Sequence, residues 1–332
     1  MTYSHRFFLY APAGALLLLV LLYSVYWKMQ ADMLSARLDA LNGGEVSPGI
    51  VLSFAEKSVG GYPFRLDTVL SGVTLAHRGP EGETAWRTEK LALHAMSYGR
   101  PLYLIETTGL QSFGLPPEKP GGPPRIYLFT PALSHASVLM RDGALLRFDM
   151  DIRGVDGKEA SKGAAPDRTF IAERAQFHLI RRGQDRADIV MQIDGGTIGM
   201  GFMPKLGPEL AHAELHASIS AAKAFAGFET GKTNMLNAIE RWREEGGALE
   251  AQDLKLNCGR VNTSLQGSLK LDEAWNADGT LGGLFAASDL TGYVMKGSFN
   301  TPPQGQLALK LQFAKGDLKA SVDSALGPGA GP

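Results

Sequence analysis

Residues 265–271 read LQGSLKL and residues 307–313 read LALKLQF, and in both runs apolar and polar side chains alternate. Residues 187–193, ADIVMQI, follow the same pattern. A period of two places successive side chains on opposite faces of a strand, so these runs predict half-buried strands with one apolar and one polar face. The segments between strands are too short for crossover helices, which favours antiparallel pairing of neighbours.

Composition supports a β-rich chain. The 332 residues include 40 glycines and 18 prolines, which suit many strands joined by turns. We therefore predict a mainly β fold with minor α+β character: curled antiparallel sheets, an N-terminal transmembrane helix and one short amphipathic helix. The β-rich domain is expected to cover residues 45–326, with a candidate split into two subdomains near residue 205. Residues 115–124 and 156–167 are expected to be mobile loops, and residues 327–332 a disordered tail.

The N-terminus carries a candidate membrane anchor. Residues 7–26 contain no charged side chain, and a helix of this length spans the ~30 Å hydrocarbon core of a bilayer. We predict a cytoplasmic tail over residues 1–6, a transmembrane anchor over 7–27 and a helical stalk over 28–44. A cleaved signal peptide is the alternative, but the expected pair of small residues does not follow the Leu-rich run.

A second helix is predicted from about Asn234 to Glu245. Leu236, Ile239 and Trp242 fall on one side, and Gly246-Gly247 provides the stop. A helix this short needs tertiary packing, so we expect all three apolar side chains to be mostly buried against strands, with Trp242 closing the open end of the sheet.

Charge and motifs argue against several classes of function. With 33 Lys and Arg against 34 Asp and Glu, the formal net charge is -1, so the chain has no overall positive charge to attract nucleic acid. The single cysteine, Cys258, allows no intramolecular disulfide. Residues 226–233, AGFETGKT, match a relaxed phosphate-binding loop but lack the preceding buried strand, so we predict no nucleotide or other cofactor.

Metal binding and catalysis are not predicted either. His212, Glu214 and His216 alternate with apolar residues, which makes the segment a strand, and the two histidines then stand about 13 Å apart. They should point the same way without sharing a ligand. No nucleophile elbow or acid–base signature is evident, so we predict no catalytic residues and no enzyme, with an unrecognised hydrolase as the remaining alternative.

The string Gly60-Gly61-Tyr62-Pro63-Phe64-Arg65 is the most distinctive in the chain. Together with Trp242, Gly246-Gly247 and the run from Leu265 to Leu284, it resembles the bacterial envelope family called domain of unknown function 2125. The Leu-x-Gly-x-Leu-x-Leu-Asp strand is also similar to repeats in AsmA-like envelope proteins. Neither resemblance implies catalytic residues. We interpret the string as an architectural corner, in which Phe64 enters the core and Arg65 bonds a carbonyl or carboxylate.

The resemblance implies a single-pass protein of the bacterial inner membrane whose large domain faces the periplasm. The leading hypothesis is that an apolar sheet face holds or passes lipid acyl chains, or supports envelope assembly. The alternative is a structural or regulatory adaptor that recruits another envelope protein. A sheet with one apolar face needs a cover, and one short helix cannot cover many strands.

Overall fold

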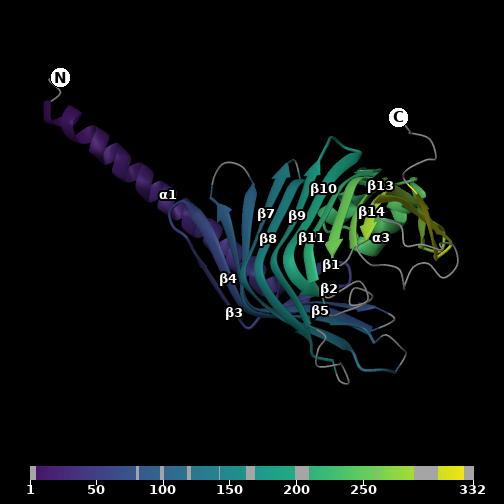
Figure 1. Ribbon diagram of the computed structural model, residues 1–332. Coiled ribbons are helices and arrows are strands. Elements are labelled where there is room, and N and C mark those ends of the chain that lie inside the picture. Colours follow the sequence, from purple (N-terminus) through teal and green to yellow (C-terminus); the bar gives the residue numbers. More distant parts are fainter. Residues whose placement is uncertain are drawn as a thin grey trace.

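The computed structural model describes residues 5–79, 82–97, 101–117, 121–141, 143–161, 169–198, 209–259, 261–287 and 306–324. Within these ranges the chain forms an N-terminal helix, a single sheet of sixteen strands and a short helical segment between β11 and β12. The sheet is curled but not closed, and the N-terminal half of α1 projects from one end of it (Figure 1). The mainly β prediction is confirmed.

The helices are α1 (His5–Leu41), η2 (Ala222–Phe225, a 3-10 helix), α2 (Ala226–Glu229) and α3 (Met235–Glu244). The strands are β1 (Gly44–Ser47), β2 (Ile50–Ser53), β3 (Glu56–Gly60), β4 (Arg65–Gly79), β5 (Gly82–Met96), β6 (Leu102–Leu115), β7 (Arg125–Arg141), β8 (Ala144–Glu159), β9 (Thr169–Arg181), β10 (Arg186–Ile198), β11 (Glu209–Ser220), β12 (Leu249–Cys258), β13 (Val261–Leu271), β14 (Ala277–Ala287), β15 (Gln306–Ala314) and β16 (Asp317–Ser324).

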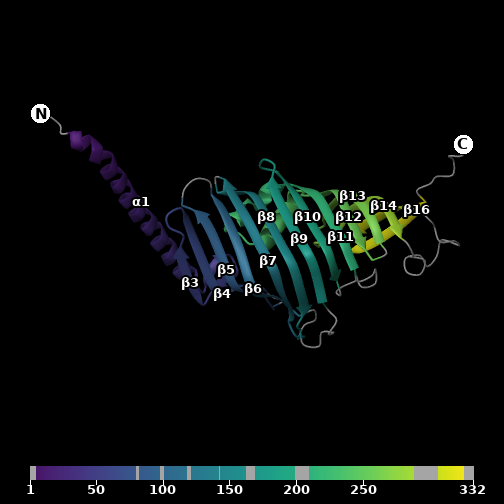
Figure 2. The same cartoon turned by 60° about the vertical axis from the view of Figure 1, so that its left-hand side comes forward.

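Sheet topology is a simple meander. From β4 to β16 each strand pairs antiparallel with the next strand in the sequence, while β2 and β3 both pair with β4. The strands therefore lie in chain order from α1 to the C-terminal end, as Figure 2 shows. β10 and β11 pair along their length, and the candidate split near residue 205 falls outside the described residues.

Helix α1 joins the predicted anchor and stalk in one piece. It is long and apolar enough to cross a membrane. It ends at Leu41, and Gly43 with φ 80° allows the turn into β1. Asn42 then fixes the junction, because its side chain accepts a bond from the Phe54 amide and donates one to the Phe54 carbonyl.

Two segments that were predicted to be loops are only partly so in the structure. Residues 156–159 were expected in a loop but form the end of β8. Gly157 leaves room here: a side chain at this position would meet the Phe170 ring. Leu115, also expected in a loop, is the last residue of β6. Residues 116–117 and 121–124 are loop, while 118–120, 162–168 and 327–332 lie outside the described residues.

Candidate functional site

One face of the sheet carries an almost unbroken row of apolar side chains. Antiparallel partners that stand directly opposite each other share a face, so the register defines the row. From β4 to β16 its members are Thr68, Leu93, Ile105, Ala136, Met150, Phe177, Met191, Leu215, Leu254, Leu265, Gly283, Leu309 and Val322. At about 4.8 Å per strand the row is about 58 Å long.

The end of this face nearest α1 is covered. Leu52, Phe54, Leu70 and Val73 form a buried cluster, and Leu38 and Leu41 from the end of α1 pack against it. The Lys57 ammonium group also connects β3 to α1: it lies 2.8 Å from the Ser35 hydroxyl and 2.6 Å from the Asp39 carboxylate. The stalk half of α1 is therefore packed on its own sheet.

A second cover lies over β11 to β13. Trp242 of α3 packs with Ala221 and Ala224, and with Ile219 and Leu271 on the apolar face. Its indole N–H donates to the Ser220 carbonyl at 2.8 Å. Farther along, a third cluster centred on Ala251, Leu265 and Leu281 includes side chains from β15.

The predicted helix signature is largely confirmed. Asn234 caps α3 by accepting from the Asn237 amide, and Gly246 ends it with φ 72°. A side chain at position 247 would lie 2.2 Å from the Trp242 indole nitrogen, so Gly247 gives the ring its place. The expectation for Leu236 is wrong. Its side chain is 55% exposed, whereas Ile239, on the same side of the helix, packs against the Trp242 cluster.

The middle of the apolar face has no such cover. The six row members on β5 to β10 are half-buried or exposed, and none belongs to the three clusters found among the described residues. Met191 is 43% exposed. Phe148 and Phe177 lie side by side here, with ring centroids 5.8 Å apart. About 24 Å of apolar surface therefore remains accessible between two covered ends.

The opposite face carries paired charges. Five histidines each contact a carboxylate: His94 with Asp67, His135 with Glu106, His178 with Asp149, His212 with Asp194, and His216 with Glu214. Four of these contacts are 2.7 Å long and the His135–Glu106 contact is 3.7 Å long. The polar strand face is confirmed, but the sequence did not show its cross-strand pairing.

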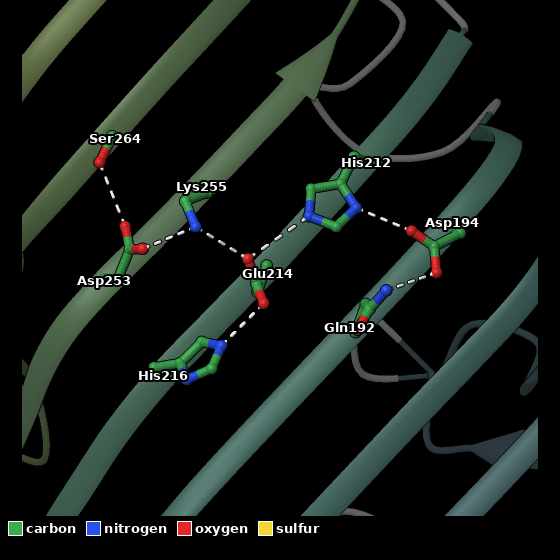
Figure 3. Close-up of polar contacts among 8 residues, drawn as sticks. All are labelled: Gln192, Asp194, His212, Glu214, His216, Asp253, Lys255 and Ser264. Carbon is green, nitrogen blue, oxygen red and sulfur yellow. Dashed lines mark hydrogen bonds and ion pairs between the residues drawn. The ribbon is translucent and has the colours of Figure 1, made fainter.

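Figure 3 shows part of this face over β10 to β13. His212 and His216 point the same way from β11, as predicted, but both contact the Glu214 carboxylate between them, at 3.6 and 2.7 Å. This shared carboxylate is a contact that the sequence did not show, and it does not bear on the prediction that the two histidines share no metal ion. In the part of the chain that the structure describes, no group of three or more His, Cys, Asp or Glu side chains could hold a metal ion.

Two carboxylates on this face are strongly stabilised in their charged form. Asp151 receives two bonds from Arg174, at 2.8 and 2.9 Å, and further bonds from Arg153, which together lower its pKa to about 2. The hydrogen bond from His216, followed by that from Lys255, lowers the pKa of Glu214 to about 2. The bonds from Arg174 to Asp151 and from Lys255 to Glu214 each connect neighbouring strands, on the face opposite the apolar row.

The Gly60–Arg65 corner contacts α1. The Tyr23 hydroxyl donates to the Pro63 carbonyl at 2.5 Å, and the Trp27 indole donates to the Arg65 carbonyl at 2.8 Å. Tyr62 meets Trp27 edge to face, with centroids 5.4 Å apart. Gly61, at φ 96°, makes the turn.

Two predictions about this corner had different outcomes. Arg65 pairs with Asp67 at 3.1 Å, as expected. Phe64 is 60% exposed and does not enter the core, so that prediction is wrong. Strand alternation does not apply to Phe64, because β4 begins only at Arg65 and the preceding residues form a turn beside the helix.

A family model described as "Uncharacterized protein conserved in bacteria (DUF2125)" matches residues 27–282. The chain belongs to this family. The match includes the Gly60–Arg65 corner, α3 and the uncovered middle of the sheet, whereas residues 7–26 and the strands β15 and β16 lie outside it. No curated protein and no solved structure matches the chain.

Proposed function

We propose that this chain is a single-pass protein of the bacterial inner membrane, with its sheet in the periplasm, and that the uncovered apolar face over β5 to β10 holds lipid acyl chains. The main support for the proposal is that one face of the sheet is covered at both ends and uncovered between them. Its two ends are covered by helices, and the stretch between them presents apolar side chains without a cover. Exposed apolar surface of this extent is typical of an interaction site.

Acyl chains fit this surface better than a peptide does. The described side chains of the row between β5 and β10 are all apolar, and a peptide would bring backbone polar groups that need hydrogen-bond partners. The uncovered length of about 24 Å exceeds the ~15 Å half-thickness of a hydrocarbon core, so a whole acyl chain can be accommodated.

The position of the face supports the same occupant. One end of the face is packed on Leu38 and Leu41, which belong to the same helix as the residues that are expected to span the bilayer. Lipid is therefore the apolar ligand nearest to the site.

Site-specific photocrosslinking in intact membranes tests the proposal. A photoreactive residue replaces Met191 on the apolar face, and the matched control replaces its neighbour Val190, which stands between His178 and His216 on the polar face. We expect phosphorus-labelled lipid to be captured at position 191 and not at position 190. Equal labelling at both positions, or none at 191, would overturn the proposal. Adducts of protein size at position 191 would favour the adaptor hypothesis instead.

A further inference from the structure

The Gly60–Arg65 corner is fixed at a defined level of α1. Besides the bonds from Tyr23 and Trp27, the Ser24 hydroxyl lies 2.7 Å from the Tyr62 hydroxyl. Ser97 holds the other side of the corner through its backbone N–H and its hydroxyl, which both donate to the Phe64 carbonyl, at 3.1 and 2.9 Å. Backbone carbonyls accept most of these bonds, so the corner cannot move along the helix without breaking them.

That level coincides with the expected membrane boundary. The charge-free run of α1 ends at Tyr26, and Lys28 is the first charged residue after it. Tyrosine and tryptophan favour the headgroup layer, and Tyr23, Tyr26 and Trp27 all lie here. The stretch of α1 that contacts the corner, Tyr23 to Trp27, is therefore the one expected in the interface.

The corner presents apolar side chains at this boundary. Phe64 is 60% exposed, and Met96, which pairs with Arg65 at the end of β5, is also exposed. The Arg65 side chain is exposed beside them and can reach lipid phosphate. An exposed aromatic next to a basic residue is the composition of an interfacial membrane contact.

We propose that the corner is a second membrane contact, in which Phe64 and Met96 enter the boundary between headgroups and acyl chains while Arg65 stays among the headgroups. This inference rests on α1 spanning the bilayer, as proposed above, and not on the apolar sheet face binding lipid. Two points of contact restrict rotation of the sheet about α1 and hold β4 and β5 close to the membrane surface.

Spin labels report the depth of each site in the full-length chain reconstituted in vesicles of phosphatidylethanolamine and phosphatidylglycerol. Labels are placed by Phe64→Cys, Met96→Cys and two references: Leu17→Cys in the charge-free run and Leu236→Cys on α3, both exposed on the protein surface. Cys258 is buried, and the unsubstituted chain measures any labelling there. Collision rates with oxygen and with a water-soluble nickel complex are compared.

We expect the ratio of oxygen to nickel collisions at positions 64 and 96 to be severalfold higher than at 236 and lower than at 17. A ratio equal to that at 236, with 17 still shielded from nickel, overturns the corner contact and leaves the anchor intact. Exposure of position 17 to nickel overturns the anchor and the corner together. Circular dichroism of each variant verifies the fold, and because positions 64 and 96 are read independently, misfolding of one leaves the other as the test.

Discussion

The two ends of the apolar face and its middle differ in how they are stabilised. At the ends, Val73 and Trp242 are buried beneath or within helical segments. In the middle, side chains of the same chemical kind remain accessible, while Asp149 and Asp151 on the opposite face are bonded to arginine and histidine. Burial of apolar side chains stabilises the two ends of the face. The middle is stabilised by backbone hydrogen bonds between strands and by ion pairs on the opposite face. Apolar surface that does not contribute to folding is available for binding.

Trp242 gives the largest expected effect. Trp242→Ala removes a ring that is 8% exposed and leaves the Ser220 carbonyl without its donor, so it should lower the free energy of unfolding by about 3–5 kcal/mol. Trp275→Ala is the matched control, because that ring is 41% exposed, and it should cost about 1 kcal/mol or less. Urea titration of both variants measures the difference. Equal losses of unfolding free energy in the two variants would contradict the expected difference between covered and uncovered side chains.

A pair of aliphatic substitutions sharpens the comparison along the face itself. Leu70→Ala, under the end of α1, should cost about 2–4 kcal/mol, because Leu70 is 5% exposed and its removal leaves a cavity. Met191→Ala, in the uncovered middle, should cost less than about 1 kcal/mol. Thermal melts in the same detergent compare them. A large loss for Met191→Ala would show that the middle has a core after all.

Acid should weaken the middle before the end that is packed on α1. The pKa of Asp151 is about 2 in the folded protein and 3.8 in the unfolded chain. The stabilisation of the fold by this carboxylate is therefore fully present above pH 4 and is lost as the pH falls toward 2. Because Asp151 is partly exposed, we expect a loss on the order of 1 kcal/mol. Hydrogen exchange of β8 and β9 should therefore accelerate more between pH 4 and pH 2.5 than that of β4, after correction for intrinsic rates. Asp151→Asn should abolish the difference, and its persistence would contradict this account.

The corner should behave like the uncovered middle and give the smallest effect. Phe64→Ala removes a largely exposed ring, so in detergent it should change the free energy of unfolding by less than about 1 kcal/mol. The sequence had indicated a buried side chain here. A loss of 3 kcal/mol or more would show that the Phe64 ring contributes to the fold as a buried side chain does.

Local patterns predicted what depends on near neighbours. Alternation identified the strands around Leu265 and Leu309, and the residues flanking α3 marked its start and stop. The sequence did not show what depends on register or on distant contacts. Phe64 was misplaced because its turn is held by Tyr23 and Trp27, about forty residues earlier.

The missed features share this physical cause. A carboxylate and a histidine on different strands become partners only once the register is fixed, so the pairs on the polar face could not be predicted from spacing along one strand. Residues 156–159 looked like a loop because their composition is polar and includes Gly157, yet residues 156–158 pair with strands on both sides and Glu159 pairs with β7.

The meander also determines how the protein can be assembled. Because the strands pair with their neighbours in the sequence, each new pairing from β5 onward closes only a short segment of chain. The cluster between the end of α1 and β2 to β5 uses only the first part of the sequence. Synthesis from the N-terminus therefore supplies a nucleus at the α1 end first, and later hairpins can add to its free edge one at a time as the chain emerges.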